Sequence, residues 1–250
     1  MQPHRSRYWL TPKPDERFGE KARDICETYA QAQARDKEGE KTLSMDEMTG
    51  VQALERAAPD LPMEPGKPVR REFEYIRHGT QTLIAAFDVA TGKVIASVGA
   101  TRTEEDYAQF LENVIGAAPQ IKRWHIVADN LNTHLSESVV KLTARLSGVE
   151  EKSLGEKGKS GVLASLKTRE AFLRDCTHKV VFNFTPRHAS WLNQVEVWFS
   201  ILVKKVIRRG NFLSQEDLKA KMLAFIEYFN ATMAKAFRWT YKGTPLVAES

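Results

Sequence analysis

The sequence has few of the residues that cross-link a chain or anchor it in a membrane. Its 250 residues include two cysteines, Cys26 and Cys176, which are too few for a disulfide framework. No apolar run approaches the roughly 18 to 20 residues that a membrane-spanning helix needs. The basic residues near the N-terminus are not followed by the long apolar stretch of a secretory signal. These absences favour a protein of the reducing cytoplasm without a membrane partner.

The sequence also lacks a zinc-ligand pattern. Its histidines and cysteines are not paired at zinc-binding spacing, and Cys176 with His178 alone is more often a coincidence than a site. What remains is a globular composition, 42% hydrophobic and 28% charged, long enough for one sizeable core. The 37 basic and 32 acidic residues leave a net charge of +5. Such a surplus is compatible with a polyanionic partner, but it also occurs in proteins that bind no polyanion.

The hydrophobic pattern changes near residue 40. Residues 1–40 are polar, with one expected helix over 20–34, and we interpret them as a linker and a docking helix. Residues 41–250 form the expected main domain. Strands are predicted at 42–48, 79–89, 93–100, 124–128 and 180–184, and helices from 103 onward, at 136–146, 163–173, within 185–210, and at 214–233. This order predicts an α/β fold with a mixed central sheet flanked by helices.

Two segments do not fit a regular α/β alternation. Residues 50–70 contain Pro59, Pro62, Pro65 and Pro68, so we expect a long loop there. Residues 147–178 are rich in lysine and punctuated by glycine, and they form an extra segment before the last strand.

Two acids are placed where expected strands end. Asp46 arrives at the end of the first strand, and Asp129 follows the buried strand 124–128 directly. Ligands of α/β sheets collect at the carboxyl ends of strands, so acids placed there are suited to chemistry. Aspartate also caps helices and turns, which is the structural alternative for either residue taken alone.

A third acid, Glu196, lies in a helix of large apolar residues. Helical projection places it with Asn193 and Ser200 on a narrow polar strip between two apolar surfaces. The residues of those surfaces are Trp191, Trp198 and Phe199 on one side and Val197 and Ile201 on the other. A solvated helical glutamate is the common alternative. A half-buried acid needs a partner, and a cation shared with other acids is one candidate.

Three carboxylates from two strands and one helix suit Mg²⁺, which prefers oxygen ligands. Two such ions about 3.5 to 4 Å apart activate a water or a 3′-hydroxyl and stabilise the leaving oxygen of a phosphodiester. Lys204, Lys205, Arg208 and Arg209 follow Glu196, and we predict that they hold the DNA backbone. Cations also occur at helix C-termini because they interact favourably with the dipole, which is the alternative.

Three motifs carry a family resemblance. LSMDEMTG around Asp46, ADNLNTH around Asp129 and TPRHASWLNQVEVWFS around Glu196 resemble the catalytic motifs of DDE transposases of bacterial insertion sequences related to the Tc/mariner superfamily. The likeness runs from RYWL at 7–10 to FRWTYKG at 237–243. It implies an RNase H-like fold, a metal-binding triad of Asp46, Asp129 and Glu196, two Mg²⁺ or Mn²⁺ ions, and DNA strand cleavage and transfer.

The resemblance also implies neighbours for these acids. Asn130, His134, His188 and Asn193 are expected beside the metal ligands, where such groups orient a ligand or a water. Its expected partners are the element ends and target DNA, together with a second copy of the chain when the ends are synapsed. The expected location is the bacterial cytoplasm, at the nucleoid.

The sequence departs from the family in two respects. Relatives carry a helix-turn-helix module before the catalytic domain, whereas this sequence starts at its trailing edge, so an upstream helix-turn-helix polypeptide is an expected partner. The gap between Asp129 and Glu196 is wider than usual, and 147–178 is interpreted as an insertion outside the core topology. Its lysines are expected to contact DNA or another subunit; they are Lys152, Lys157, Lys159 and Lys167.

Two other functions compete with this interpretation. The first is a DNA-binding or regulatory remnant of a transposase that cuts nothing. The second is a glycoside hydrolase with paired carboxylates, which explains neither the basic charge nor the three motifs.

Overall fold

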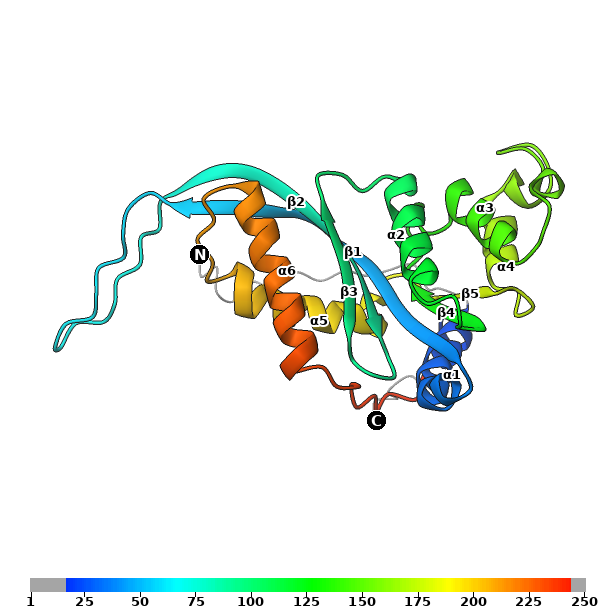
Figure 1. Cartoon of the computed structure of the whole chain (residues 1–250), viewed down its shortest axis with the longest axis horizontal. Coiled ribbons are helices and arrows are strands. Elements are labelled where there is room, and N and C mark those ends of the chain that lie inside the picture. The colour runs from blue at the N-terminus through cyan, green and yellow to red at the C-terminus, as the bar shows by residue number, and fades with distance from the viewer. Residues whose placement is uncertain (1–16, 244–250) are drawn as a thin grey trace, which may run out of the picture.

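A computed structural model of the chain describes residues 17–243. Its strands are β1 (Glu40–Arg56), β2 (Tyr75–Asp88), β3 (Val94–Gly99), β4 (Arg123–Ala128) and β5 (Val180–Phe184). Its α-helices are α1 (Phe18–Lys37), α2 (Glu104–Gly116), α3 (Glu137–Leu146), α4 (Leu166–Leu173), α5 (Gln194–Leu202) and α6 (Gln215–Thr232). Short helical turns are η2 (Glu151–Leu154), η3 (Val162–Ala164), η4 (Ser190–Leu192) and η5 (Val203–Ile207), the last of which is a π-helix that continues α5. Figure 1 shows their arrangement.

The sheet is mixed, as predicted. Within residues 17–243 its strand order is β3-β2-β1-β4-β5. The β1–β2 and β2–β3 pairs are antiparallel, whereas β1–β4 and β4–β5 are parallel. The predicted hairpin is confirmed as β2 and β3. Its turn depends on Gly92, which has a φ of +76° that side chains disfavour, and on Asp88, whose carboxylate accepts hydrogen bonds from the backbone of Ala90 and Thr91.

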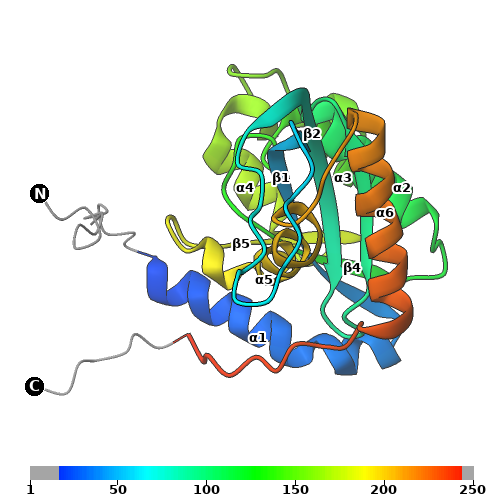
Figure 2. The ribbon, with the colours of Figure 1, turned by 90° about the vertical axis from the view of Figure 1, so that its left-hand side faces the viewer.

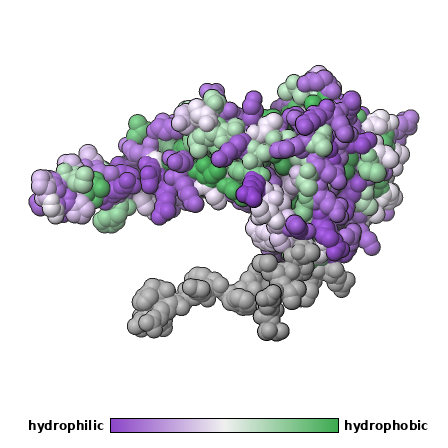
Figure 3. Space-filling view, turned by 90° about the horizontal axis from the view of Figure 1, so that it is seen from below, coloured by the Kyte–Doolittle hydropathy of each residue, from purple (hydrophilic) through white to green (hydrophobic). Residues whose placement is uncertain are grey.

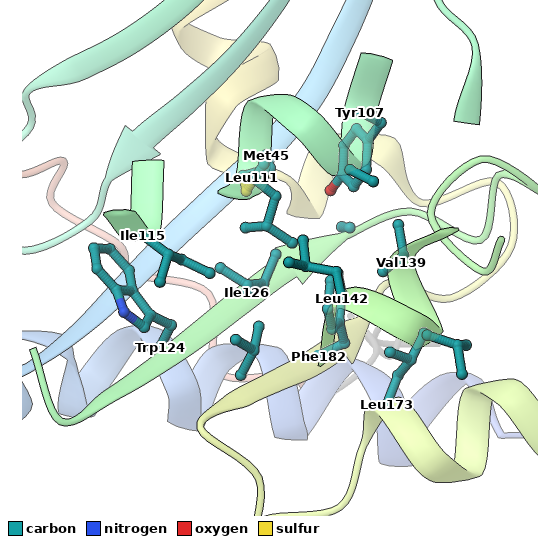
Figure 4. Packing of buried hydrophobic residues seen from close by; sticks show 14 of the residues in the cluster. Met45, Tyr107, Leu111, Ile115, Trp124, Ile126, Val139, Leu142, Leu173 and Phe182 are labelled. Atoms are coloured by element: carbon teal, nitrogen blue, oxygen red, sulfur yellow. The ribbon is translucent and has the colours of Figure 1, made fainter. Parts of the chain in front are cut away.

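Helices cover both faces of the sheet, and each face has its own core. The first layer consists of α2, α3 and α4, which Figure 1 shows at the end of the molecule away from the projecting arm. Figure 4 shows side chains of this layer, such as Met45, Leu111 and Ile126, which converge from a strand, a helix and a second strand. The second layer consists of α1, α5 and α6. A polar residue on β1 or β4 therefore lies between two apolar layers unless it is near an edge.

The predicted helix starts are confirmed by capping interactions. Thr103 and Asp106 form a reciprocal capping box at α2, because each side chain accepts a hydrogen bond from the other residue's backbone N–H. Ser136 caps α3 and Ser214 caps α6 through their side-chain oxygens. Among the described residues, no helix is both long and apolar enough to cross a membrane.

The prediction of a loop over 50–70 was wrong for its first part. Strand β1 runs for 17 residues to Arg56, and a register shift against β2 occurs at Gly50, where φ is +65°. Residues 57–74 then form an extended arm whose two sides are joined by bridges between Leu61 and Arg70 and between Glu64 and Lys67. The arm projects from the body, and its surface mixes hydrophilic and hydrophobic residues (Figures 1 and 3).

The extra segment 147–178 adds no strand, but it is not outside the core. Leu154, Leu163 and Leu173 are each at most 2% exposed and belong to the first layer. Two of its lysines form ion pairs within the protein: Lys157 with Glu104 and Glu137, and Lys159 with Glu156. The segment therefore completes the first layer.

The helix predicted at 20–34 is confirmed as α1. Residues 234–243, which we call the C-terminal strap, run alongside it (Figure 2). Phe237 stacks on Phe87 at 4.5 Å between ring centroids, and Trp239 meets Tyr29 edge-on at 5.1 Å. The strap thus closes the second layer over α1. The linker predicted before α1 lies, up to residue 16, outside the described residues.

Candidate active site

Asp46 lies in the middle of β1 rather than at its end, because β1 continues to Arg56. The parallel register with β4 nevertheless brings it level with Asp129. Ser44 pairs with Val127; Asp46 is two residues after Ser44 within β1, and Asp129 is two residues after Val127, directly past the end of β4. The predicted juxtaposition of the two acids therefore arises from strand pairing and not from two strand ends.

The carboxylate of Asp46 is almost fully buried, with 6% of the residue exposed. Its Oδ1 accepts a hydrogen bond from the backbone N–H of Glu47 at 2.8 Å, and its Oδ2 accepts one from Asn193 Nδ2 at 3.1 Å. Burial, followed by the negative charge of Asp129, raises the pKa of Asp46 to about 7. The two acids are therefore close enough to repel each other.

Asn193, which helical projection placed on a narrow polar strip with Glu196 and Ser200, is fully buried. It precedes the first residue of α5, and its Nδ2 also donates to the backbone oxygen of Met45 at 3.0 Å. Its Oδ1 accepts a hydrogen bond from the Ser44 hydroxyl, whose oxygen accepts from the backbone N–H of Val195 at 2.9 Å. These bonds, which we call the Ser44–Asn193 clamp, fix the start of α5 against β1.

Glu196 follows the clamp in the first turn of α5 and is half-buried. Burial, and then the negative charge of Asp129, raise the pKa of Glu196 above its ordinary value. The buried apolar surface beside it is formed by Trp198 and Phe199. Two other parts of the projection were wrong: Trp191 is 50% exposed and Val197 is 44% exposed. Glu196 is therefore open to solvent on one side and within electrostatic range of Asp129.

Asp129 follows β4 and is held by two donors on one oxygen. Its Oδ1 accepts from the backbone N–H of Leu131 at 2.9 Å and lies 2.8 Å from His134 Nδ1. Burial acts to raise the pKa of Asp129, but the hydrogen bond and charge of His134 outweigh it and hold that pKa below its ordinary value. Conversely, burial acts to lower the pKa of His134, and its hydrogen bonds to Asp129 and Glu47 raise it to about 10.

Glu47 is a site residue that sequence reasoning missed. Its side chain is only 1% exposed, and its Oε2 lies 2.9 Å from His134 Nε2. Asp46, Glu47 and His134 each offer a ligand atom, and these atoms lie within 4.8 Å of one another. The sequence did contain a signal for Glu47, namely a second acid directly after Asp46 on the same strand. Because successive strand residues face opposite sides of a sheet, and both sides of this sheet are covered by helices, such an acid needs a buried partner.

The other predicted neighbours differ in their contacts. Asn130 donates through Nδ2 to the backbone oxygen of Thr185, so it joins the loops after β4 and β5. His188 is exposed and has a φ of 58°, and within residues 17–243 it makes no hydrogen bond to the three acids. His134 contacts Asp129 directly and Asn193 contacts Asp46 directly.

A groove begins at Glu196 and continues along the basic end of the helix. Lys204 and Arg208 line it together with Glu47, Glu196 and Ser200. Lys205 and Arg209 are exposed on the same stretch but do not line this groove. Two of the four predicted cations therefore lie beside the acids.

Comparisons with known proteins identify the family and the fold of this chain. The family model described as DDE superfamily endonuclease matches residues 41–219, which is well over half of the chain. The crystal structure of the catalytic domain of Mos1 mariner transposase has a TM-score of 0.51 and 13% sequence identity, and the match covers 88% of this chain and 85% of that one. No curated protein matches at a significant level.

Two further Mos1 structures match with lower scores. The catalytic domain with raltegravir and Mg has a TM-score of 0.47 at 13% identity, and the match covers 86% of this chain and 85% of that one. The paired-end complex with Mn has a TM-score of 0.37 at 16% identity, with 90% and 64% covered. The mixed sheet flanked by helices matches the RNase H-like fold of the Mos1 catalytic domain, for which the TM-score is 0.51, and the predicted fold is confirmed. With 41–219 matched by its family model, the chain belongs to the DDE superfamily endonucleases.

Proposed function

We propose that the chain is a transposase catalytic domain that cleaves DNA at the ends of an insertion sequence and transfers the freed strand to target DNA. The proposal is supported by the negative charge of Asp129, which acts to raise the pKa of both Asp46 and Glu196, and by a groove that Glu196 lines together with Lys204 and Arg208. The acids and the cations come from β1, the end of β4 and one continuous helical stretch.

The three acids fit divalent cations. All three offer carboxylate oxygens, the ligands that Mg²⁺ prefers, and Mn²⁺ is the alternative. Burial and mutual repulsion raise the pKa values of Asp46 and Glu196, and a bound cation relieves that repulsion. We propose two ions, which would supply an activated water or 3′-hydroxyl and stabilise the leaving oxygen. Mos1 structures with Mg and with Mn are in line with this metal preference.

The protein's own residues then have distinct tasks. The Ser44–Asn193 clamp holds Asp46 and the start of α5 in fixed relation, so Glu196 is presented from a rigid helix end. Lys204 and Arg208 extend from the same helical stretch and bind the phosphate backbone beside the scissile bond. Partners under this proposal are the element ends, target DNA, a second copy of the chain at synapsis and a helix-turn-helix polypeptide. A Mos1 complex with the left transposon end is a related example.

Metal dependence tests the proposed chemistry. Purified chain is incubated with labelled duplexes carrying candidate element ends, in Mg²⁺, in Mn²⁺ or in EDTA. We expect nicking with either metal and none in EDTA, because the carboxylates alone cannot stabilise the leaving oxygen. Nicking that persists in EDTA would contradict the proposal. Binding that is never followed by cutting would support the alternative, a catalytically silent remnant.

The salt dependence of DNA binding tests the basic groove. Replacing Lys204 or Arg208 with alanine is expected to reduce the slope of log association constant against log salt concentration by about 1, because each phosphate contact releases a counterion. Lys141→Ala is the matched control, because it removes the same charge from a lysine of α3 that pairs with Glu137 and Glu151. Fluorescence anisotropy over a salt series measures the slope. Equal slopes for all variants and the unmodified chain would rule out phosphate contact at the groove.

A further inference from the structure

The buried acid Glu47 has no task in the chemistry proposed above. It follows Asp46 on β1, and a carboxylate oxygen of each lies within 4.8 Å of the other, yet the two side chains have different hydrogen-bond partners. Asp46 meets Asn193 from the second layer, whereas Glu47 meets His134 on the side of the first layer. His134 packs against this layer: its ring lies 4.4 Å, between centroids, from the ring of Tyr107. Tyr107 and Met45 of the first layer are labelled in Figure 4.

His134 connects this buried acid to the second acid of the site. Its Nε2 lies 2.9 Å from Glu47 Oε2, and its Nδ1 lies 2.8 Å from Asp129 Oδ1. The side chains of Glu47 and His134 are 1% and 0% exposed, whereas that of Asp129 is 35% exposed. The three residues therefore form a chain of hydrogen-bonded groups that leads from the interior to the solvent-facing site.

The hydrogen bonds described here involve only one of the two carboxylate oxygens of Asp129. Oδ1 is occupied by two donors, the Leu131 N–H and His134, and among residues 17–243 no donor contacts Oδ2. A buried ion pair is often no more stabilising than apolar residues of the same volume. A contribution to folding stability therefore does not by itself explain why a buried glutamate is found at position 47. Groups that hydrogen-bond to a metal ligand, by contrast, set its orientation.

We propose that Glu47 is a positioning residue that acts through His134 to lock the Asp129 carboxylate, so that Oδ2 is presented to a divalent cation. This inference rests on the proposed function, since it takes Asp129 as a metal ligand. Glu47 itself touches neither metal nor DNA under this proposal.

Metal binding by the free protein tests the proposal without relying on cutting. Mn²⁺ is titrated into the unmodified chain and into Glu47→Gln, and unbound Mn²⁺ is measured by electron paramagnetic resonance. We expect the Mn²⁺ dissociation constant to rise about 10- to 100-fold in Glu47→Gln, which keeps the size of the side chain but removes its charge. The matched control is Glu40→Gln: Glu40 Oε2 lies 2.7 Å from His125 Nε2 at the start of β1, away from the site. It is expected to leave the dissociation constant unchanged.

A double-mutant cycle tests whether Glu47 acts through His134. We expect His134→Asn to weaken Mn²⁺ binding at least as much as Glu47→Gln, and the double variant to bind no more weakly than His134→Asn alone. In nicking assays, the Mn²⁺ concentration for half-maximal rate should rise in Glu47→Gln while the rate recovers at saturating Mn²⁺. A general loss of structure would lower the rate at every concentration.

The outcomes separate the two proposals. If the unmodified chain binds no Mn²⁺, the proposed metal site itself is wrong. If it binds Mn²⁺ and Glu47→Gln binds equally well, the positioning role alone is overturned. If Glu47→Gln reduces the Mn²⁺ affinity by the same factor in the presence of His134 and in the His134→Asn background, Glu47 does not act through His134. Should Glu47→Gln not fold, Glu47→Asp replaces it, because that change keeps the charge but withdraws it from His134, and the same rise in dissociation constant is expected.

Discussion

Replacing Asp129 with asparagine is expected to reduce metal-dependent nicking at least about 1000-fold, because the loss of about 4 kcal/mol of charge stabilisation in the transition state corresponds to that factor. The substitution keeps the shape of the side chain and removes one negative charge that acts on both Asp46 and Glu196. It also places an amide next to His134 Nδ1, which donates to Asp129 in the unmodified chain. Both changes are expected to weaken the binding of a divalent cation.

Initial nicking rates at saturating metal measure this effect. Glu196→Gln is expected to show a loss of similar size, since it removes the acid presented by α5. Asp175→Asn is the matched control, because the Asp175 carboxylate accepts hydrogen bonds from Thr177 in the extra segment. All three variants should unfold at similar temperatures. If Asp129→Asn retained more than a tenth of the rate, Asp129 would not be a metal ligand in the reaction.

Trp198→Ala is expected to lower the free energy of unfolding by about 3 to 5 kcal/mol, which is the usual cost of removing a buried tryptophan from a core. Trp198 is 0% exposed and packs against Phe199 and Phe229 in the second layer. Its removal leaves a cavity between α5 and α6 that the clamped start of α5 cannot close. Trp198→Phe should cost less, because it removes fewer atoms and also removes an indole N–H that has no partner within residues 17–243.

Urea unfolding followed by circular dichroism measures the cost. Trp191→Ala is the control, because Trp191 lies in the short turn η4 just before the same helix, is 50% exposed and has Tyr241 as its aromatic neighbour. For a chain of this size, 1 kcal/mol corresponds to about 2 to 4 °C in Tm. Equal losses for Trp191→Ala and Trp198→Ala would mean that burial does not set the stability of this layer.

The parts of the fold that sequence reasoning predicted well depend on local signals. The β2–β3 hairpin is specified by two apolar runs around a turn with Gly92, and α2 by the capping box of Thr103 and Asp106. The second half of β1 was missed because its stability comes from pairing with β2 across the arm. Residues 50–56 contain a glycine and no long apolar run, so nothing local marks them as a strand.

The candidate site was also predicted only where local sequence signals mark it. Asp129 follows a strand that is obvious from its apolar run, and its position was correct. Asn193 was misplaced because projection assumed a continuous helix, whereas a 3₁₀ turn, η4, ends one residue before it and α5 begins one residue after it. Glu47 could not be assigned a partner, because His134 is 87 residues away in the chain and only the folded sheet brings them together.

The C-terminal strap has a consequence for synthesis of the chain. Phe237 and Trp239 cover a layer that also contains α1, so residues translated more than 200 positions apart complete the same core. Domains fold from the N-terminus as they leave the ribosome, yet α1 keeps part of its apolar surface uncovered until the strap emerges. A chain released before residue 234 therefore lacks the side chains that cover α1 and exposes apolar surface, which is the kind of surface that chaperones bind.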